Sequence, residues 1–296
     1  MCSNVAGHNR QKDFFKKILA SGRINHSYIF SGISGIGKKF FACELARSIL
    51  CSNGSFFEDC DCLNCRQVKA NNYADLYIYE NKELNVETIR NISESSGMTG
   101  FLGKWKIYIL DGVEKLSTGA NIVAGNAFLK TLEEPGENTL FLLITSKYDM
   151  ILPTIRSRCA LVNFSPLTFD EVRQVMVENN YNISDDIIKL SGGSIERGFL
   201  INDLKLFSIL EYIKSKDYKS FTTYILGVDD LSVIKSVMEF LYPYALEMYK
   251  SSGSYIYMQY GEYILEILNR LNYNINIELA KHDFVSKTIE VFSERV

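Results

Sequence analysis

Short apolar runs alternate with longer stretches of helical pattern from about residue 27 to residue 165, and this alternation restricts the fold more than any other feature. The apolar runs are HSYIFSG, ADLYIYE, KWKIYILDG, TLFLLITS and CALVNFS. Stretches with a helical pattern lie between them, at residues 38–50, 86–96 and 119–133. Continuous apolar strands separated by helices are what a parallel sheet covered on both faces requires. We therefore expect an α/β domain at residues 1–165.

The pattern changes at Pro166. The following TFDE places Thr168 and Glu171 at the spacing of a capping box, in which the two side chains bind backbone amides at the start of a helix. Helix-spaced apolar positions then continue to Val296, with few candidates for strands. We expect a small helical domain at residues 166–202 and a helical bundle at residues 203–296.

Composition excludes several classes of protein. With 296 residues, of which 47% are hydrophobic, the chain can bury a substantial core. Its net charge of −3 argues against a generally basic protein that coats nucleic acid, although a local basic surface stays open. No charged start followed by an apolar segment marks the N-terminus, and the longest apolar runs are too short to cross a bilayer. We therefore expect a cytoplasmic protein without membrane contact.

A glycine-rich stretch, FSGISGIGKKF, follows the first expected strand and begins a helix. Gly32, Gly37 and Lys38 match the first seven positions of the motif G-x-x-x-x-G-K-[ST], with Gly35 between them. In this context backbone N–H groups and the helix start attract phosphate, and the lysine reaches the β- and γ-phosphates. The eighth position holds Lys39, which cannot replace the hydroxyl that binds Mg²⁺. A phosphate-binding loop and a glycine-rich turn without nucleotide both stay open.

An acidic residue ends the apolar run of KIYILDGVEKL. Asp111 is expected at a strand end, where it approaches the same Mg²⁺ as the phosphate loop. Proteins that hydrolyse ATP with this arrangement normally carry a glutamate at the next position, which here is Gly112. We expect Glu114, two residues further on, to point away and to cap a helix. The two departures predict weak or absent ATP hydrolysis, and they leave the binding of ATP with Mg²⁺ in this site open.

Four of the seven cysteines lie in CSNGSFFEDCDCLNC, at residues 51–65. A reducing cytosol disfavours structural disulfides, so this clustering indicates metal ligands or catalytic thiols. Free thiols without a metal stay open as the simpler alternative.

The order of these motifs resembles the AAA+ subunits of the bacterial DNA polymerase III clamp loader across essentially the whole chain. The resembling stretches are VAGHNRQKDFFKKILASGRINHSYIFSG, the loop at residues 32–39, the cysteine cluster, NVETIRNISE, KIYILDGVEKL, NAFLKTLEEPGENTLFLLIT, LPTIRSRCALVNFSPLT and GGSIERGFL. The resemblance implies an AAA+ P-loop domain with an inserted zinc module, a helical lid domain and a C-terminal helical collar that holds a pentamer together. Within the family, the missing hydrolytic residues and the length of 296 residues indicate a delta-prime-type stator without ATPase activity of its own. The alternative is an ATP-hydrolysing subunit of the gamma/tau type.

The resemblance also implies a metal and partners. Clamp-loader subunits of this type carry a structural zinc module where the cysteine cluster lies, so Cys51, Cys60, Cys62 and Cys65 would bind Zn²⁺ as four thiolates. The spacing C-x₈-C-x-C-x₂-C has one residue fewer between the second and third cysteines than the family has, which predicts a strained cage or a lower affinity. The implied partners are the delta and gamma/tau subunits of a heteropentamer and, through that complex, the sliding clamp and primer-template DNA.

Three more residues match functional positions of the family. Arg158, in RSRC, matches the arginine finger, which stabilises charge on the γ-phosphate bound by a neighbouring subunit. An ordinary salt bridge is the alternative for this arginine. Thr145 matches a sensor-1 position, for which a simple strand-end cap is the alternative. Arg197, in GGSIERGFL, matches a sensor-2 position, where it contacts nucleotide in its own subunit or ties two domains together.

Overall fold

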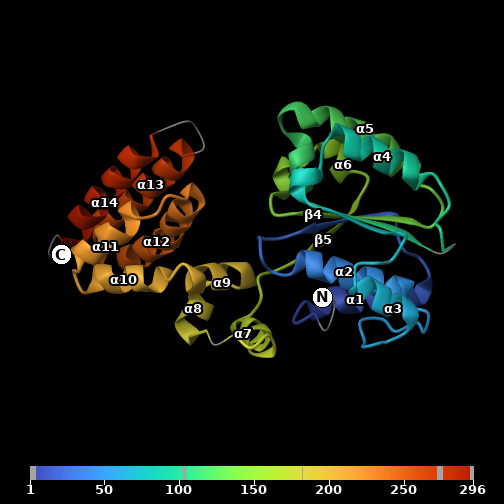
Figure 1. Ribbon diagram of the computed structural model, residues 1–296, viewed down its shortest axis with the longest axis horizontal. Coiled ribbons are helices and arrows are strands. Elements are labelled where there is room, and N and C mark those ends of the chain that lie inside the picture. The colour runs from blue at the N-terminus through green and yellow to red at the C-terminus, as the bar shows by residue number, and fades with distance from the viewer. Residues whose placement is uncertain (1–4, 103–104, 182, 272–275, 294–296) are drawn as a thin grey trace. The chain divides into compact units, whose positions relative to one another are not determined.

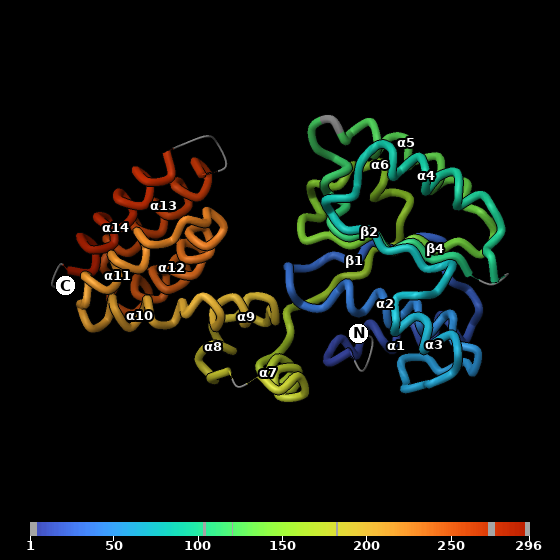
Figure 2. Tube along the Cα trace, in the orientation of Figure 1, coloured from blue at the N-terminus to red at the C-terminus, as the bar shows by residue number. Residues whose placement is uncertain are grey.

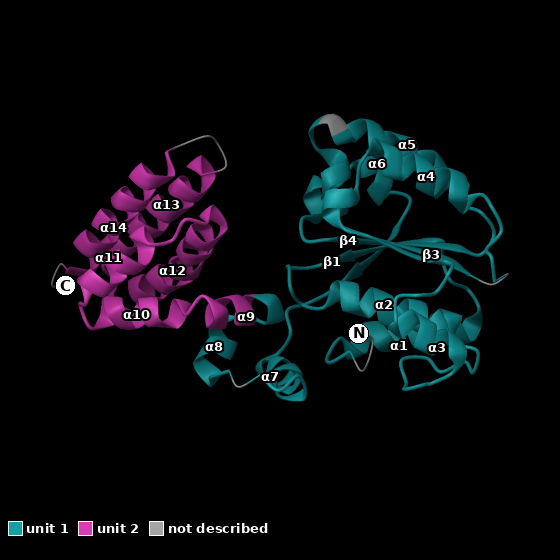
Figure 3. Ribbon diagram, viewed as in Figure 1, with its two compact units in different colours: residues 1–196 teal, residues 197–296 magenta. Residues whose placement is uncertain are grey.

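A computed structural model describes residues 5–102, 105–181, 183–271 and 276–293 (Figure 1). The chain divides into two compact units, Met1–Glu196 and Arg197–Val296 (Figure 3). The finer division of the helical half at residues 166–202 and 203–296 stays a prediction.

Among the described residues, the first unit contains a five-stranded parallel sheet with the strand order β2-β3-β4-β1-β5. Its strands are β1 (Ser27–Ser31), β2 (Leu76–Tyr79), β3 (Lys106–Asp111), β4 (Thr139–Thr145) and β5 (Ala160–Asn163). Each apolar run of the sequence forms one strand, so the expected α/β architecture is confirmed. All of β4 is buried, as a central strand covered on both faces requires. The carboxyl ends of parallel strands meet at one edge of the sheet, where ligands of open α/β folds bind.

Helices cover both faces of the sheet (Figure 1 and Figure 2). One face carries α1 (Asn9–Ser21), α2 (Lys38–Leu50) and α3 (Leu63–Lys69), and the other carries α4 (Val86–Ser96), α5 (Ile122–Glu133) and α6 (Pro153–Arg156). Side chains alternate between the faces along each strand, which builds two separate cores. Phe30 packs against Phe15 and Phe41 in the first core. Its neighbour Ile29 belongs to the second core, together with Phe128.

Short 3₁₀ turns lie in the segments that connect strands of the sheet to the following helices. They are η1 (Asn81–Glu83), η2 (Val113–Ser117), η3 (Gly119–Asn121) and η4 (Tyr148–Met150). The chain continues after β5 through α7 (Phe169–Glu178), α8 (Asp185–Leu190) and α9 (Ile195–Asp203). The capping box before α7 is confirmed, because the Thr168 N–H donates to Glu171 Oε2 at 2.8 Å and the Glu171 N–H donates to Thr168 Oγ1 at 3.3 Å.

The regular secondary structure in the described residues of the second unit is helical. Beyond the end of α9, its helices are α10 (Leu206–Lys214), α11 (Tyr218–Leu226), α12 (Leu231–Ser252), α13 (Tyr255–Arg270) and α14 (Ile277–Ser293). The hydroxyls of Tyr260 and Thr288 form a buried hydrogen bond of 2.6 Å between α13 and α14. This arrangement confirms the expected helical C-terminal region. Within the described ranges, none of the helices is both long enough and apolar enough to span a membrane.

Candidate nucleotide-binding site and metal centre

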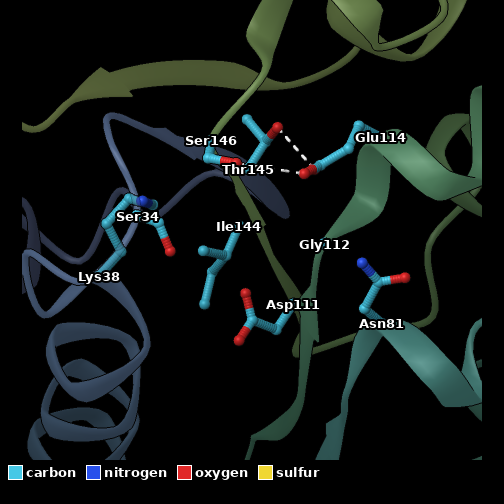
Figure 4. Close-up of a pocket in the computed structure, with 9 residues that line it drawn as sticks. All are labelled: Ser34, Lys38, Asn81, Asp111, Gly112, Glu114, Ile144, Thr145 and Ser146. Atoms are coloured by element: carbon cyan, nitrogen blue, oxygen red, sulfur yellow. Dashed lines mark hydrogen bonds between the residues drawn. The ribbon is translucent and has the colours of Figure 1, made fainter. Parts of the chain in front are cut away.

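A pocket of about 220 Å³ lies at the carboxyl edge of the sheet (Figure 4). The residues that line it are Ser34, Lys38, Asn81, Asp111, Gly112, Glu114, Ile144, Thr145 and Ser146. Three of the residues expected at a nucleotide site, Lys38, Asp111 and Thr145, therefore lie around one pocket. They come from the start of α2 and from the ends of β3 and β4. The parallel sheet brings these distant parts of the sequence together.

Lys38 follows Gly37, whose positive φ of 91° turns the loop into α2. The Lys38 ammonium donates to the carbonyl oxygens of Gly32 and Ile33 at 2.7 and 2.6 Å. Burial lowers the pKa of Lys38, and the negative charge of Asp111 opposes that change. Lys38 thus lies at the helix start, where its present partners are carbonyl groups of the loop itself, and its role toward phosphate stays a prediction.

The start of α9 braces the loop. Gly35 accepts a hydrogen bond at its carbonyl oxygen from the Ile195 N–H at 2.9 Å, and Ser34 Oγ donates to Glu196 Oε2 at 2.9 Å. A β-carbon at Gly35 would lie only 2.3 Å from Ser194 Oγ. The loop conformation therefore depends on residues 194–196 as well as on its own glycines.

Lys39 occupies the position of the missing hydroxyl and is absent from the pocket lining. Its ammonium forms an ion pair of 2.8 Å with Glu80, the residue before η1. Partial burial acts to lower the pKa of Lys39, but the hydrogen bond to Glu80 raises it overall. The side chain is 37% exposed, so this pair adds little stability. Lys39 therefore offers no ligand to a metal, and Glu80 balances its charge.

Glu114 lines the pocket, which corrects the expectation that it points away. Its carboxylate accepts hydrogen bonds from Thr145 Oγ1 at 2.7 Å and from Ser146 Oγ at 3.4 Å (Figure 4). These partners are side-chain hydroxyls and not backbone N–H groups at a helix start, which does not fit the expected capping role. The cause is the turn after β3. The chain enters η2 there, η2 packs against β4, and Glu114, the third residue after Asp111, faces the end of β4.

Gly112 separates the two carboxylates of the pocket. Its φ of 80° lies in the left-handed region, and an added β-carbon would lie 2.8 Å from the Asn81 β-carbon. Burial raises the pKa of Asp111, whereas the charges of Lys39 and Lys38 lower it. A glutamate directly after Asp111 does not fit this backbone without a shift of Asn81 or of the turn.

Sequence reasoning did not single out Ser34 and Asn81, which also line the pocket. Ser34 lies within the glycine-rich loop, and Asn81 comes two residues after the end of β2. The general rule that parallel strands end at one edge of the sheet was the available signal for Asn81.

Arg158 forms an ion pair with Glu133, as its alternative interpretation as an ordinary salt bridge requires. Its Nε donates to Glu133 Oε1 at 2.8 Å, Nη2 contacts the same carboxylate, and Nη1 donates to the Thr154 carbonyl oxygen at 2.8 Å. The Arg158 side chain remains 31% exposed. Its role toward another subunit stays a prediction.

The two sensor positions have local partners. Besides donating to Glu114, Thr145 Oγ1 accepts the Lys147 N–H at 2.9 Å, so the hydroxyl also serves as a strand-end cap. Arg197 Nη2 donates to the Glu239 carbonyl oxygen at 3.4 Å within the second unit. Neither contact tests a role in sensing nucleotide.

The four clustered cysteines come together between α2 and the start of α3. Cys51, Cys60, Cys62 and Cys65 place their sulfur atoms within 4.8 Å of one another. Tetrahedral Zn²⁺ with Zn–S bonds of about 2.3 Å needs sulfur atoms about 3.8 Å apart, and sulfur atoms within 4.8 Å of one another are compatible with this metal. The short spacing between Cys60 and Cys62 does not keep the thiols apart.

Hydrogen bonds to sulfur favour the thiolate form of Cys51 and Cys62, whereas burial raises the pKa of Cys65. Cys51 Sγ accepts the Ser55 N–H at 3.4 Å, and Cys60 Sγ accepts from Asn53 Nδ2 at 3.5 Å. Partial burial acts to raise the pKa of Cys62, but backbone hydrogen bonds from Cys65 and Ser52 hold it at about 6. Thiolates are the form that binds metal, so the donor set matches a metal centre.

Comparison with known proteins identifies the family. Residues 7–168, more than half of the chain, match the family described as DNA polymerase III, delta subunit. The chain is 36% identical to the DNA polymerase III subunit tau of Escherichia coli over 173 residues, which cover 58% of this chain and 26% of that protein. It is 32% identical to the subunit delta' of Bacillus subtilis over 165 residues, which cover 55% of this chain and 49% of that protein. The matched region thus spans about a quarter to a half of these curated relatives.

A solved structure is similar over nearly the whole chain. It is a DNA polymerase III gamma subunit-related protein from Thermotoga maritima, with a TM-score of 0.59 and 18% identity, covering 95% of this chain and 99% of that one. This similarity supports the fold. The match over residues 7–168 decides the family: the chain belongs to the DNA polymerase III delta-subunit family, the clamp-loader family that its motifs predicted.

Proposed function

We propose that the chain is a delta-prime-like stator of the DNA polymerase III clamp loader in the cytoplasm. In this role it completes an AAA+ heteropentamer with delta and gamma/tau subunits, and the assembled complex loads the sliding clamp onto primer-template DNA. The observation that carries the proposal is that the pocket lacks two groups, the metal-binding hydroxyl and the acid directly after Asp111. Lys39 replaces the metal-binding hydroxyl and pairs with Glu80, and Gly112 occupies a position where a side chain collides with Asn81.

Arg158 supplies the contribution to catalysis in this proposal. It gives up its contact with Glu133 and reaches the γ-phosphate bound by the adjacent ATPase subunit, where a guanidinium stabilises the charge of the transition state. The 31% exposure of its side chain supports this role, because part of the side chain already faces solvent. The subunit thus needs no hydrolysis of its own to affect the rate of the complex.

Zn²⁺ has a structural role in the proposal. Four thiolates close the coordination sphere and leave no position for a reacting water. The segment at residues 51–65 is too short and polar to form a core, and metal binding contributes about 10 kcal/mol to the folding of comparable sites. The metal therefore holds the loop between α2 and α3.

The second candidate is an ATP-hydrolysing subunit of the gamma/tau type. Glu114 favours it, because this carboxylate lies in the same pocket as Lys38 and Asp111 and contacts the sensor-1 position Thr145. In that case Glu114 positions the attacking water in place of an acid at residue 112. The tau relative, at 36% identity over the matched region, is also compatible with this candidate.

Two measurements on the purified chain separate the candidates. A stator assembles with delta and gamma/tau subunits into one pentamer, measured by native mass spectrometry, and shows no ATP turnover alone. Turnover by the isolated chain that is abolished by Lys38→Ala and by Glu114→Gln would establish the ATPase and refute the stator. Failure to enter the pentamer would refute both.

A further inference from the structure

A buried arginine contacts the cysteine cluster from the helix that follows the phosphate loop. Arg47, on α2, is only 1% exposed and is among the largest fully buried side chains of the described chain. Its Nε donates to both carboxylate oxygens of Glu44 at 2.9 Å. Its Nη1 donates to Cys65 Sγ at 3.2 Å, and its Nη2 donates to the Glu58 carbonyl oxygen at 2.7 Å.

These contacts join the parts of the chain that carry the four cysteines. Arg47 and Glu44 lie one turn apart on α2, which ends directly before Cys51. Glu58 belongs to the loop that leads to Cys60, and Cys65 lies on α3. One guanidinium therefore holds the helix, the loop and α3 in the arrangement that brings the sulfur atoms together.

The charges fit a metal centre better than a simple packing role. Four thiolates around Zn²⁺ leave a net negative charge, which a buried cation that donates N–H to sulfur reduces. Desolvation makes a buried ion pair expensive, so an apolar pair would join α2 to α3 with less loss of stability. Glu44 takes up the side of the guanidinium that faces away from the sulfur atom and keeps the cation in a fixed orientation.

We propose that Arg47, oriented by Glu44, is the positioning residue of the metal centre: it stabilises Cys65 as a ligand and fixes the loop that carries Cys60. This inference rests on the Zn²⁺ site proposed above. Residues that donate hydrogen bonds to metal ligands typically affect metal affinity about 10- to 100-fold. We expect a loss of this size when Arg47 is replaced, although the four cysteines remain.

The test compares metal binding by full-length variants. The double substitution Glu44→Gln/Arg47→Met removes both charges together, so that no carboxylate is left buried and unpaired. Arg66→Met is the matched control, because Arg66 is exposed and directly follows Cys65 on α3. Zn²⁺ affinity is measured by competition with a chromophoric chelator, and Co²⁺ is added in parallel to record the thiolate-to-cobalt absorption bands. Circular dichroism checks the fold.

The inference predicts about 10- to 100-fold weaker Zn²⁺ binding and shifted Co²⁺ bands for the double variant, and unchanged values for Arg66→Met. Should the double variant not fold, Arg47→Lys keeps the charge but loses the planar fork, and the same loss is expected. Equal affinity and equal spectra in the wild type and either Arg47 variant would refute the role of Arg47 alone. A wild type that takes up neither metal would refute the zinc proposal, and this inference with it.

Discussion

Gly112 provides a direct stability test of the account of the pocket. The substitution Gly112→Ala adds one methyl group at the position where hydrolysing proteins of this type carry an acid. The backbone there has a φ of 80°, and the new β-carbon would lie 2.8 Å from the Asn81 β-carbon. Both features act against any side chain at this position.

The expected cost has two parts. A residue other than glycine in the left-handed region costs about 1–2 kcal/mol. Overlap with a packed neighbour adds about 1–3 kcal/mol, depending on how far η1 yields. We therefore expect Gly112→Ala to lower the free energy of unfolding by about 2–5 kcal/mol. Asn81→Gly removes the overlap but not the backbone strain. The double variant Gly112→Ala/Asn81→Gly is therefore expected to be more stable than the sum of the two single variants predicts, by the cost of the overlap alone.

Urea unfolding followed by tryptophan fluorescence measures this cost. The chain has one tryptophan, Trp105, which directly precedes β3 and packs against the first core, so its signal reports on the first unit. Gly97→Ala is the matched control, because Gly97 has a φ of −75° and its added β-carbon would meet nothing closer than 3.8 Å. We expect this control to change stability by less than about 0.5 kcal/mol.

A Gly112→Ala protein as stable as the wild type would refute the reasoning, since the backbone would then accommodate a side chain. If Gly112→Ala lowers the free energy of unfolding equally with and without Asn81→Gly, the whole loss comes from the backbone conformation and none from the overlap. The same reasoning predicts that Gly112→Glu yields a destabilised chain without ATP turnover.

Two further predictions concern the cysteines and His8. Removal of Zn²⁺ by a chelator exposes Cys60 and Cys62 of the cluster to iodoacetamide, whereas Cys159 stays unlabelled at about pH 8, because burial raises its pKa to about 11. Labelling of Cys60 and Cys62 without chelator, read by peptide mass spectrometry, would contradict the metal. Burial lowers the pKa of His8, whose ring contacts the Ile36 carbonyl oxygen at 2.8 Å, below the unfolded value of about 6.5. The stability that neutral His8 contributes is therefore complete above about pH 6.5 and declines as pH falls toward the folded pKa. Asparagine tolerates the φ of 53° at this position, so His8→Asn should remove the decline in urea unfolding curves. An equal decline in the wild type and in His8→Asn would contradict this prediction.

The sheet and the helices around it were predictable because their patterns are local. The apolar runs are continuous where both faces are buried, and Lys38, Asp111 and Thr145 lie at the strand ends and helix start that their positions indicated. Glu114 was misjudged because its direction depends on the 3₁₀ turn that Gly112 begins, and sequence spacing does not specify that turn.

Contacts between distant segments were not predictable from local patterns. Lys39 and Glu80 are 41 residues apart, and nothing in either segment indicates their pairing. In CELARSIL, Glu44 and Arg47 have the spacing of an ordinary surface pair on a helix, yet both are buried beneath the cysteine cluster. Only the packing of α3 and of residues 51–62 against α2 turns this common pair into a contact of the cysteine cluster.

In the proposed function, Arg158 acts on a nucleotide held by another subunit. Its most direct test is the steady-state ATPase rate of the reconstituted clamp loader with sliding clamp and primed DNA, comparing the wild type with Arg158→Ala after native mass spectrometry has confirmed that both assemble. Arg156→Ala is the control, because Arg156 instead pairs with Asp149 at 3.7 Å and lies over the Tyr148 ring. We predict a several-fold or larger fall for Arg158→Ala alone, with the isolated chain inactive throughout. An unchanged rate would mean that Arg158 serves only its ion pair with Glu133, which would contradict the account.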